Sequence, residues 1–246
     1  MKTGPVLILI PLALMAVGCA RPSVPVAPAP VIAVENFLAD LTRQVTGTRL
    51  EVRSLVPFGV DPHGYEPTPQ DIAAVARARL IVVNGAGLES FISTLISNAG
   101  GDRPLVEASD GLAGRGADPH FWLDPVMVVR YVQNIRDALS RIDPAGEKTY
   151  GANGDAYIRQ LRELDSWIEA KVSAIPAEKR FLITDREGLG YFADRYGFRI
   201  VGTARGPQLA LYIYSLTDSS GPAPTYLEMM RYDVTMIVDA LAGDAR

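Results

Sequence analysis

Four short runs typical of β-strands alternate with helical segments in the first half of the chain, and this alternation limits the fold more than any other feature. The runs cover residues 31–34, 50–56, 80–83 and 104–107. Connectors rich in glycine and proline separate them from segments with helical spacing. Strands joined by crossover helices run parallel, with helices on both faces of the sheet. The pattern therefore predicts an α/β fold.

A long amphipathic segment divides the alternation into two halves. It begins at the Asp143-Pro144 cap and can continue to about Ala174. Some 30 helical residues span roughly 45 Å, which is longer than a small domain is wide. A coiled coil is the alternative, but the apolar stripe covers too few heptads to favour one. We expect one rigid helix that joins two lobes, each a mostly parallel sheet flanked by helices.

The strand–helix alternation resumes after this helix. Apolar runs predict strands at residues 181–184, 199–202 and 209–214, and helices at 189–196 and 226–241. We therefore expect an N-terminal lobe over residues 31–142, the linking helix over 143–175 and a C-terminal lobe over 176–246.

The only two histidines of the chain stand in identical Asp-Pro-His tripeptides. His63 follows the second predicted strand, and His120 follows the fourth. One histidine in a polar loop is usually just solvated, but two in the same tripeptide are harder to explain in that way. Imidazole is the commonest metal ligand in proteins. Ligands of open α/β sheets gather beyond the carboxyl ends of the strands, so the two histidines could form one metal site.

The loop that carries His63 ends on a predicted helix start. Thr68 is placed as an N-cap, Pro69 as the first helical residue and Asp71 as the carboxylate that closes a capping box. The helix start should hold the loop in place.

The beginning of the chain has the pattern of a bacterial lipoprotein signal. Residues 1–18 contain Lys2 and then a short apolar stretch broken by proline, which is too short for a membrane-spanning helix. The small residues before Cys19 resemble a lipobox, in which that cysteine is lipidated; an ordinary signal peptide is the alternative. Residues 19–30 are proline-rich and predict an extended tether. We expect an extracytoplasmic, membrane-anchored protein.

Composition and missing motifs exclude several functions. The formal net charge is −4 and there is no run of Lys or Arg, which argues against a nucleic-acid partner. Residues 84–87, Asn-Gly-Ala-Gly, lack the pattern of a nucleotide-binding loop. Neither HExxH nor GxSxG occurs, so we expect no enzyme, and a metallohydrolase is the weakest of the alternatives.

Several stretches together resemble the metal-binding lipoproteins of zinc and manganese ABC transporters, the cluster A-I solute-binding proteins. The stretches are residues 59–71, 118–125, 190–193 with 195–197, and 221–227. The resemblance implies two α/β lobes joined by one long helix, a metal ion held between the lobes, and delivery of that ion to a membrane permease. His63 and His120 match two of the family's four ligands.

The other two ligand positions depart from the family pattern. Arg186 stands where the family has histidine or glutamate, and Tyr214 stands where it has aspartate. A guanidinium keeps its proton, and at roughly 4 Å from a dication it would be repelled by about 8 kcal/mol at an effective dielectric of about 20. A phenol with a pKa near 10 is a poor ligand.

Nearby carboxylates are the candidates for the missing ligands. Glu187, Asp185 and Asp218 could take this role, although each could equally be a helix-end charge or a turn residue. Glu66 and Asp124 are candidates for orienting the histidines. A helix–strand–helix unit of the family is missing after residue 203, so we expect the C-terminal lobe to be shortened by one strand.

These features predict a monomeric solute-binding protein that captures zinc or manganese and delivers it to the permease of an ABC importer. The alternative is a degenerate, metal-free surface lipoprotein or adhesin of the same fold, which Arg186, Tyr214 and the missing unit would favour.

Overall fold

The computed structural model describes residues 29–183, 188–202 and 209–243. Cys19 and most of the tether lie outside these ranges. None of the helices within them is both long and apolar enough to cross a bilayer.

A four-stranded parallel sheet forms the first part of the molecule. Its strands are β1 (Val31–Ala33), β2 (Val52–Ser54), β3 (Leu80–Val83) and β4 (Leu105–Glu107), in the spatial order β2-β1-β3-β4. Val31 pairs with Val52 on one side and with Leu80 on the other, so the first residues of β1, β2 and β3 are in register. The four strands lie within the four predicted runs, which confirms the α/β prediction for this half.

Helices cover both faces of this sheet. On one face Val31 and Val82 pack in a core with α1 (Asn36–Thr46) and α4 (Pro125–Ile142). On the other face the neighbouring residues Ile32 and Ile81 pack with α2 (Pro69–Ala76) and α3 (Ile92–Asn98). Because successive strand residues face opposite sides, burial of both faces requires the unbroken apolar runs of the central strands β1 and β3.

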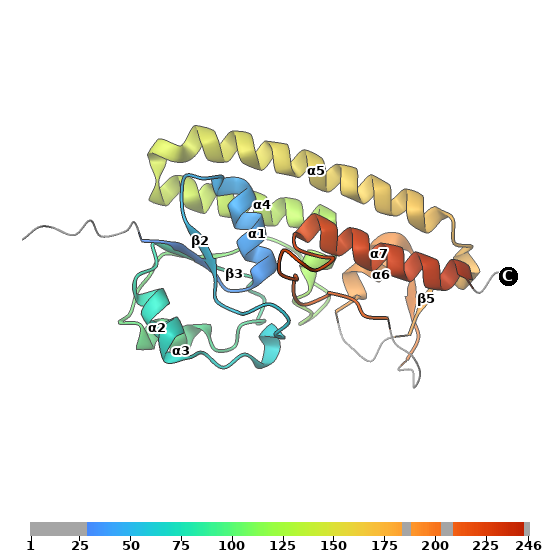
Figure 1. Ribbon diagram of the computed structural model, residues 1–246, viewed down its shortest axis with the longest axis horizontal. Helices are drawn as coiled ribbons and strands as arrows, with labels where there is room; N and C mark the ends of the chain where they lie inside the picture. The colour runs from blue at the N-terminus through green and yellow to red at the C-terminus, as the bar shows by residue number, and fades with distance from the viewer. Residues whose placement is uncertain (1–28, 184–187, 203–208, 244–246) are drawn as a thin grey trace, which may run out of the picture.

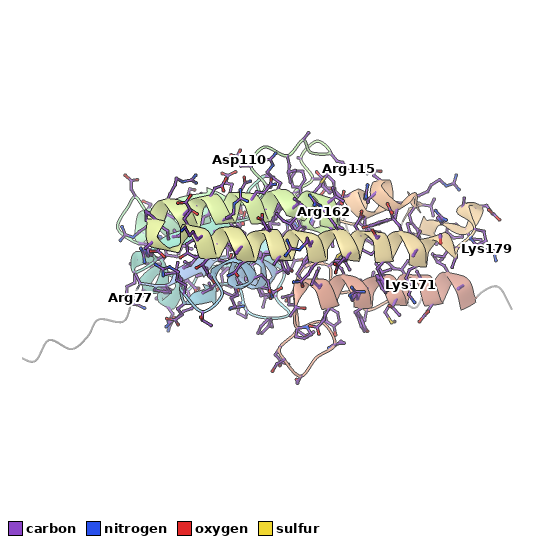
Figure 2. The ribbon with its side chains drawn as sticks, turned by 90° about the horizontal axis from the view of Figure 1, so that it is seen from above. Arg77, Asp110, Arg115, Arg162, Lys171 and Lys179 are labelled. Atoms are coloured by element: carbon purple, nitrogen blue, oxygen red, sulfur yellow. The ribbon has the colours of Figure 1, made fainter. Side chains whose placement is uncertain are left out.

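The helix α5 (Glu147–Ser173) extends along both parts of the molecule (Figure 1). Its 27 residues span about 40 Å. It contacts α1 and α4 near its start and α6 and α7 farther along. Its apolar stripe is buried, whereas Arg162 and Lys171 lie on the side that faces solvent (Figure 2). A short 3₁₀ turn, η3 (Pro144–Gly146), separates it from α4.

The second part is smaller. It contains the 3₁₀ turn η4 (Ala177–Lys179), β5 (Phe181–Leu182), α6 (Gly190–Tyr196), β6 (Arg199–Ile200) and the terminal helix α7 (Tyr226–Gly243). Within the described residues, β5 and β6 form a two-stranded parallel sheet.

The predicted strand at residues 209–214 is wrong. These residues form no strand, and their polar backbone groups pair with side chains instead of a neighbouring strand. The N–H of Tyr212 donates to the Asp233 carboxylate at 2.9 Å, and the carbonyl of Ile213 accepts from the Trp122 indole at 2.9 Å. We call residues 211–216 the strap, because they connect the second part of the chain to the first.

Candidate metal centre

The two Asp-Pro-His loops bring the two histidines together. His63 lies in the 3₁₀ turn η1 (Pro62–Gly64) after β2, and His120 directly precedes the 3₁₀ turn η2 (Phe121–Leu123) after β4. Their Nε2 atoms lie 2.9 Å apart. A tetrahedral zinc ion with Zn–N bonds of about 2.0–2.1 Å holds two such nitrogens about 3.3 Å apart. A shift of a few tenths of an ångström would therefore let both nitrogens bind one ion.

The repeated tripeptide forms the same local structure twice. The Asp61 carboxylate accepts the backbone N–H of His63 at 3.0 Å, and the Asp118 carboxylate accepts that of His120 at 3.0 Å. A hydrogen bond from an aspartate side chain to the backbone N–H two residues later defines an Asx turn. The proline between the two residues fixes its own φ angle and so stiffens the turn. The tripeptide thus fixes the direction in which each histidine leaves its loop.

His120 has its tautomer set by Asp118. Its ring is buried, and Nδ1 lies 2.6 Å from the Asp118 carboxylate. Burial lowers the pKa of His120, because it disfavours the imidazolium, while the bond to Asp118 opposes this shift. The neutral ring therefore donates its Nδ1 proton to Asp118 and points the Nε2 lone pair toward His63. A carboxylate behind the imidazole is the usual support of a metal-binding histidine.

A buried polar network supports the loop residue that precedes His120 in the sequence. The Asn84 amide donates to the carbonyl of Pro119 at 3.0 Å and accepts from the Tyr131 hydroxyl. The Glu89 carboxylate accepts the backbone N–H of Asn84. Burial raises the pKa of Glu89, and burial together with the nearby Glu89 carboxylate raises that of Glu35 well above its usual range. The loop rests on a network inside the protein.

Two aromatic rings lie against the histidine pair. The Tyr214 ring, on the strap, has its centroid 5.7 Å from that of His63 and 5.5 Å from that of His120. The Trp122 ring lies 5.0 Å from His120 on the same measure. The strap therefore places Tyr214 beside the candidate ligands.

The other residues singled out from the sequence have different positions. Asp185, Arg186 and Glu187 lie outside the described residues. Asp218 lies in an exposed turn, where its carboxylate accepts from the N–H and hydroxyl of Ser220. In residues 29–183, 188–202 and 209–243, no group of three His, Cys, Asp or Glu side chains is placed to hold a metal. A metal-ligand role of Asp218 or Glu187 stays a prediction.

The supporting carboxylate is not one of the two expected from the sequence. Glu66 is exposed, and Asp124 caps α4 by accepting the N–H of Val126 at 2.8 Å. Asp118 has the role instead. Its place two residues before the histidine, the same in both tripeptides, was a signal that could have identified it. The capping box of Thr68 and Asp71 at the start of α2 is confirmed.

With this geometry in place, the chain can be compared with known proteins. The family described as "Zinc-uptake complex component A periplasmic" matches residues 31–210. The chain belongs to this family. The match supports the resemblance read from the two Asp-Pro-His stretches, and it assigns the chain to a metal-uptake family that is not a family of enzymes.

Two curated relatives of the chain are named for the metal that they bind, one for manganese and one for iron. The manganese-binding lipoprotein MntA of Halalkalibacterium halodurans is 41% identical over 173 residues, which cover 68% of this chain and 57% of the relative. The iron-binding protein YfeA of Yersinia pestis is 32% identical over 268 aligned residues, covering 86% of this chain and 85% of the relative. The chain spans 57–58% of the length of the first two curated relatives that it matches.

Solved structures show the same fold. The manganese-bound periplasmic metal-binding protein from Candidatus Liberibacter asiaticus has a TM-score of 0.77 and 25% identity, covering 86% of this chain and 98% of the other. The periplasmic zinc-binding protein TroA of Treponema pallidum has a TM-score of 0.77 at 23% identity, covering 87% of this chain and 99% of the other. The two-lobed α/β architecture expected from the sequence is confirmed.

Proposed function

We propose that this protein captures a divalent transition metal, zinc or manganese, outside the cytoplasm and delivers it to the permease of an ABC importer. The observation that supports this proposal is the pair of imidazole Nε2 atoms 2.9 Å apart, one of them backed by Asp118. Neutral imidazoles suit both ions when carboxylates complete the shell. Anchoring through a lipid on Cys19 and action as a monomer are part of the proposal.

The remaining ligands would come from Asp185 and Glu187 or from Asp218. Gly188, the first described residue after residues 184–187, lies against the ring of His120: a Cβ built on it would be 3.3 Å from Cδ2. Glu187 is the residue that directly precedes Gly188 in the chain. This proximity favours one of these carboxylates over Asp218 as a third ligand.

Metal content tests the proposal. We would strip the purified protein with a chelator, offer zinc and manganese in separate experiments, and count bound metal per chain. One equivalent of either ion is the expected result, and the ion bound more tightly identifies the cargo. A parent protein that binds neither, but gains binding with Arg186→His and Tyr214→Asp together, would contradict the proposal and favour the metal-free alternative.

Replacing Asp118 by asparagine should weaken metal binding by about 10- to 100-fold, the usual cost of losing the group behind a metal-binding histidine. Asparagine can still accept the His120 backbone N–H, but its amide can also donate to Nδ1 and so favour the tautomer that protonates Nε2. Isothermal titration calorimetry with the metal-free protein measures the change.

Asp61→Asn is the matched control. Asp61 makes the same backbone bond in its own tripeptide, but within the described residues its carboxylate is not bonded to the His63 ring. We expect a smaller loss of affinity for this variant. Equal losses in the two variants would show that the turn matters and the tautomer does not.

A further inference from the structure

The two histidines of the candidate site are held in different ways. His120 is 2% exposed and is fixed by Asp118 and by close contact with Gly188. His63 is exposed, and His120 is the partner of its ring nitrogen in the described contacts. The position of the His63 ring therefore depends on how its loop is held.

One buried hydroxyl holds that loop to the strap. The Oγ atom of Ser215 accepts the backbone N–H of Gly59 at 2.7 Å and the side-chain amide of Asn36 at 2.9 Å, and it donates to the carbonyl of Leu216 at 2.9 Å. Ser215 is 7% exposed, so water does not readily replace these bonds. Gly59 lies four residues before His63 in the same loop.

Asn36, the first residue of α1, strengthens the same connection. Its amide oxygen accepts the N–H of Leu216 at 2.7 Å, and its amide nitrogen also reaches the carbonyl of Pro57 at 3.3 Å. The loop and the strap are thus joined through one buried cluster whose members are far apart in the sequence. The strap is in turn bonded to Trp122, two residues after His120.

We infer that Ser215 is a positioning residue for the metal site: its hydroxyl sets the place of His63 relative to His120 and so couples the seating of the strap to the assembly of the site. The inference about metal affinity rests on the proposed function, whereas the inference about the position of His63 does not. Without the hydroxyl, the Gly59 N–H loses its acceptor and the loop can leave the position in which Nε2 faces His120.

Nuclear magnetic resonance of the metal-free protein tests the placement directly, because the chain has only two histidines and hence two imidazole spin systems. Ser215→Ala should shift or broaden the His63 signals, and should change those of His120 much less, because Asp118 still holds the His120 ring. Ser140→Ala is the matched control, since its hydroxyl bonds to the carbonyl of Arg136 within α4. We expect this control to leave both signals unchanged.

Calorimetric titration with zinc and with manganese completes the test. Ser215→Ala should raise the dissociation constant by about 10- to 100-fold, and Asn36→Ala should act in the same direction. Unmoved His63 signals in Ser215→Ala would overturn the inference, whatever the metal result. Signals of both histidines that move together with a large loss of thermal stability would also overturn it, because the hydroxyl would then serve the fold as a whole. Moved His63 signals in a protein whose parent binds no metal would refute the proposed function and leave the placement standing.

Discussion

Replacing His120 by alanine should abolish stoichiometric metal binding and also destabilise the protein. The ring is buried against Trp122 and Gly188 and bonds to Asp118, so its removal leaves a cavity and costs the Asp118 carboxylate one of its two bonds to residue 120. Changes of this kind cost about 1–3 kcal/mol. Metal counting after equilibrium dialysis and urea denaturation measure the two effects.

His63→Ala is the comparison that separates binding from folding. It should abolish stoichiometric binding as well, but its exposed ring contributes little to the fold, so the stability should stay within about 0.5 kcal/mol of the parent. One equivalent of metal retained in either variant would contradict the two-histidine site. An equal loss of stability in both variants would contradict the difference in how the two rings are held.

Replacing Asp233 by asparagine should stabilise the protein at alkaline pH. Asp233 is a buried residue of α7; one carboxylate oxygen accepts the Tyr212 N–H, and the other has no hydrogen-bond partner in the described residues. Burial raises its pKa from the ordinary 3.8 to about 7, and the bond from Tyr212 opposes the shift. Asparagine can accept the same N–H without carrying a charge.

The direction of the pH dependence follows from this raised pKa. The native state holds the proton more tightly than the unfolded chain, so the contribution of Asp233 to stability is fully present below pH 3.8 and is lost as the pH rises to about 7. The total loss is about 4 kcal/mol, since each pKa unit corresponds to about 1.4 kcal/mol. The parent should therefore lose stability between pH 4 and pH 8 relative to Asp233→Asn.

Urea denaturation at several pH values measures this difference. Asp218→Asn is a suitable control, because Asp218 is an exposed turn residue. Stability curves of the parent and Asp233→Asn that stay parallel from pH 4 to pH 8 would contradict a raised pKa of Asp233.

Much of the fold could be predicted from local patterns. The predicted runs contained all four strands of the first sheet. The central strands β1 and β3 are apolar at every position, because a strand buried on both faces needs apolar residues throughout. Thr68-Pro69 marked the start of α2, because capping chemistry is confined to one turn of helix. The meeting of His63 and His120 also followed from the sequence, since parallel strands end at the same edge.

The conformation of the strap could not be predicted from local sequence patterns. Residues 209–214 have the apolar composition of a strand, but a strand needs a neighbouring backbone, and here Asp233 and Trp122 supply the partners instead. Neither partner is close to the strap in sequence. The same holds for Ser215, whose bonds reach Gly59 and Asn36 across more than half of the chain.

By itself, the sequence determined the four strands of the first sheet, the long connecting helix and the two histidines as candidate ligands, because periodicity, capping and tripeptide turns act over a few residues. The tertiary structure decided which carboxylate supports His120, where Tyr214 lies and what holds the loop of His63. Hydrogen bonds between distant segments fix these features, and their geometry depends on how helices and sheets pack, which no local pattern specifies.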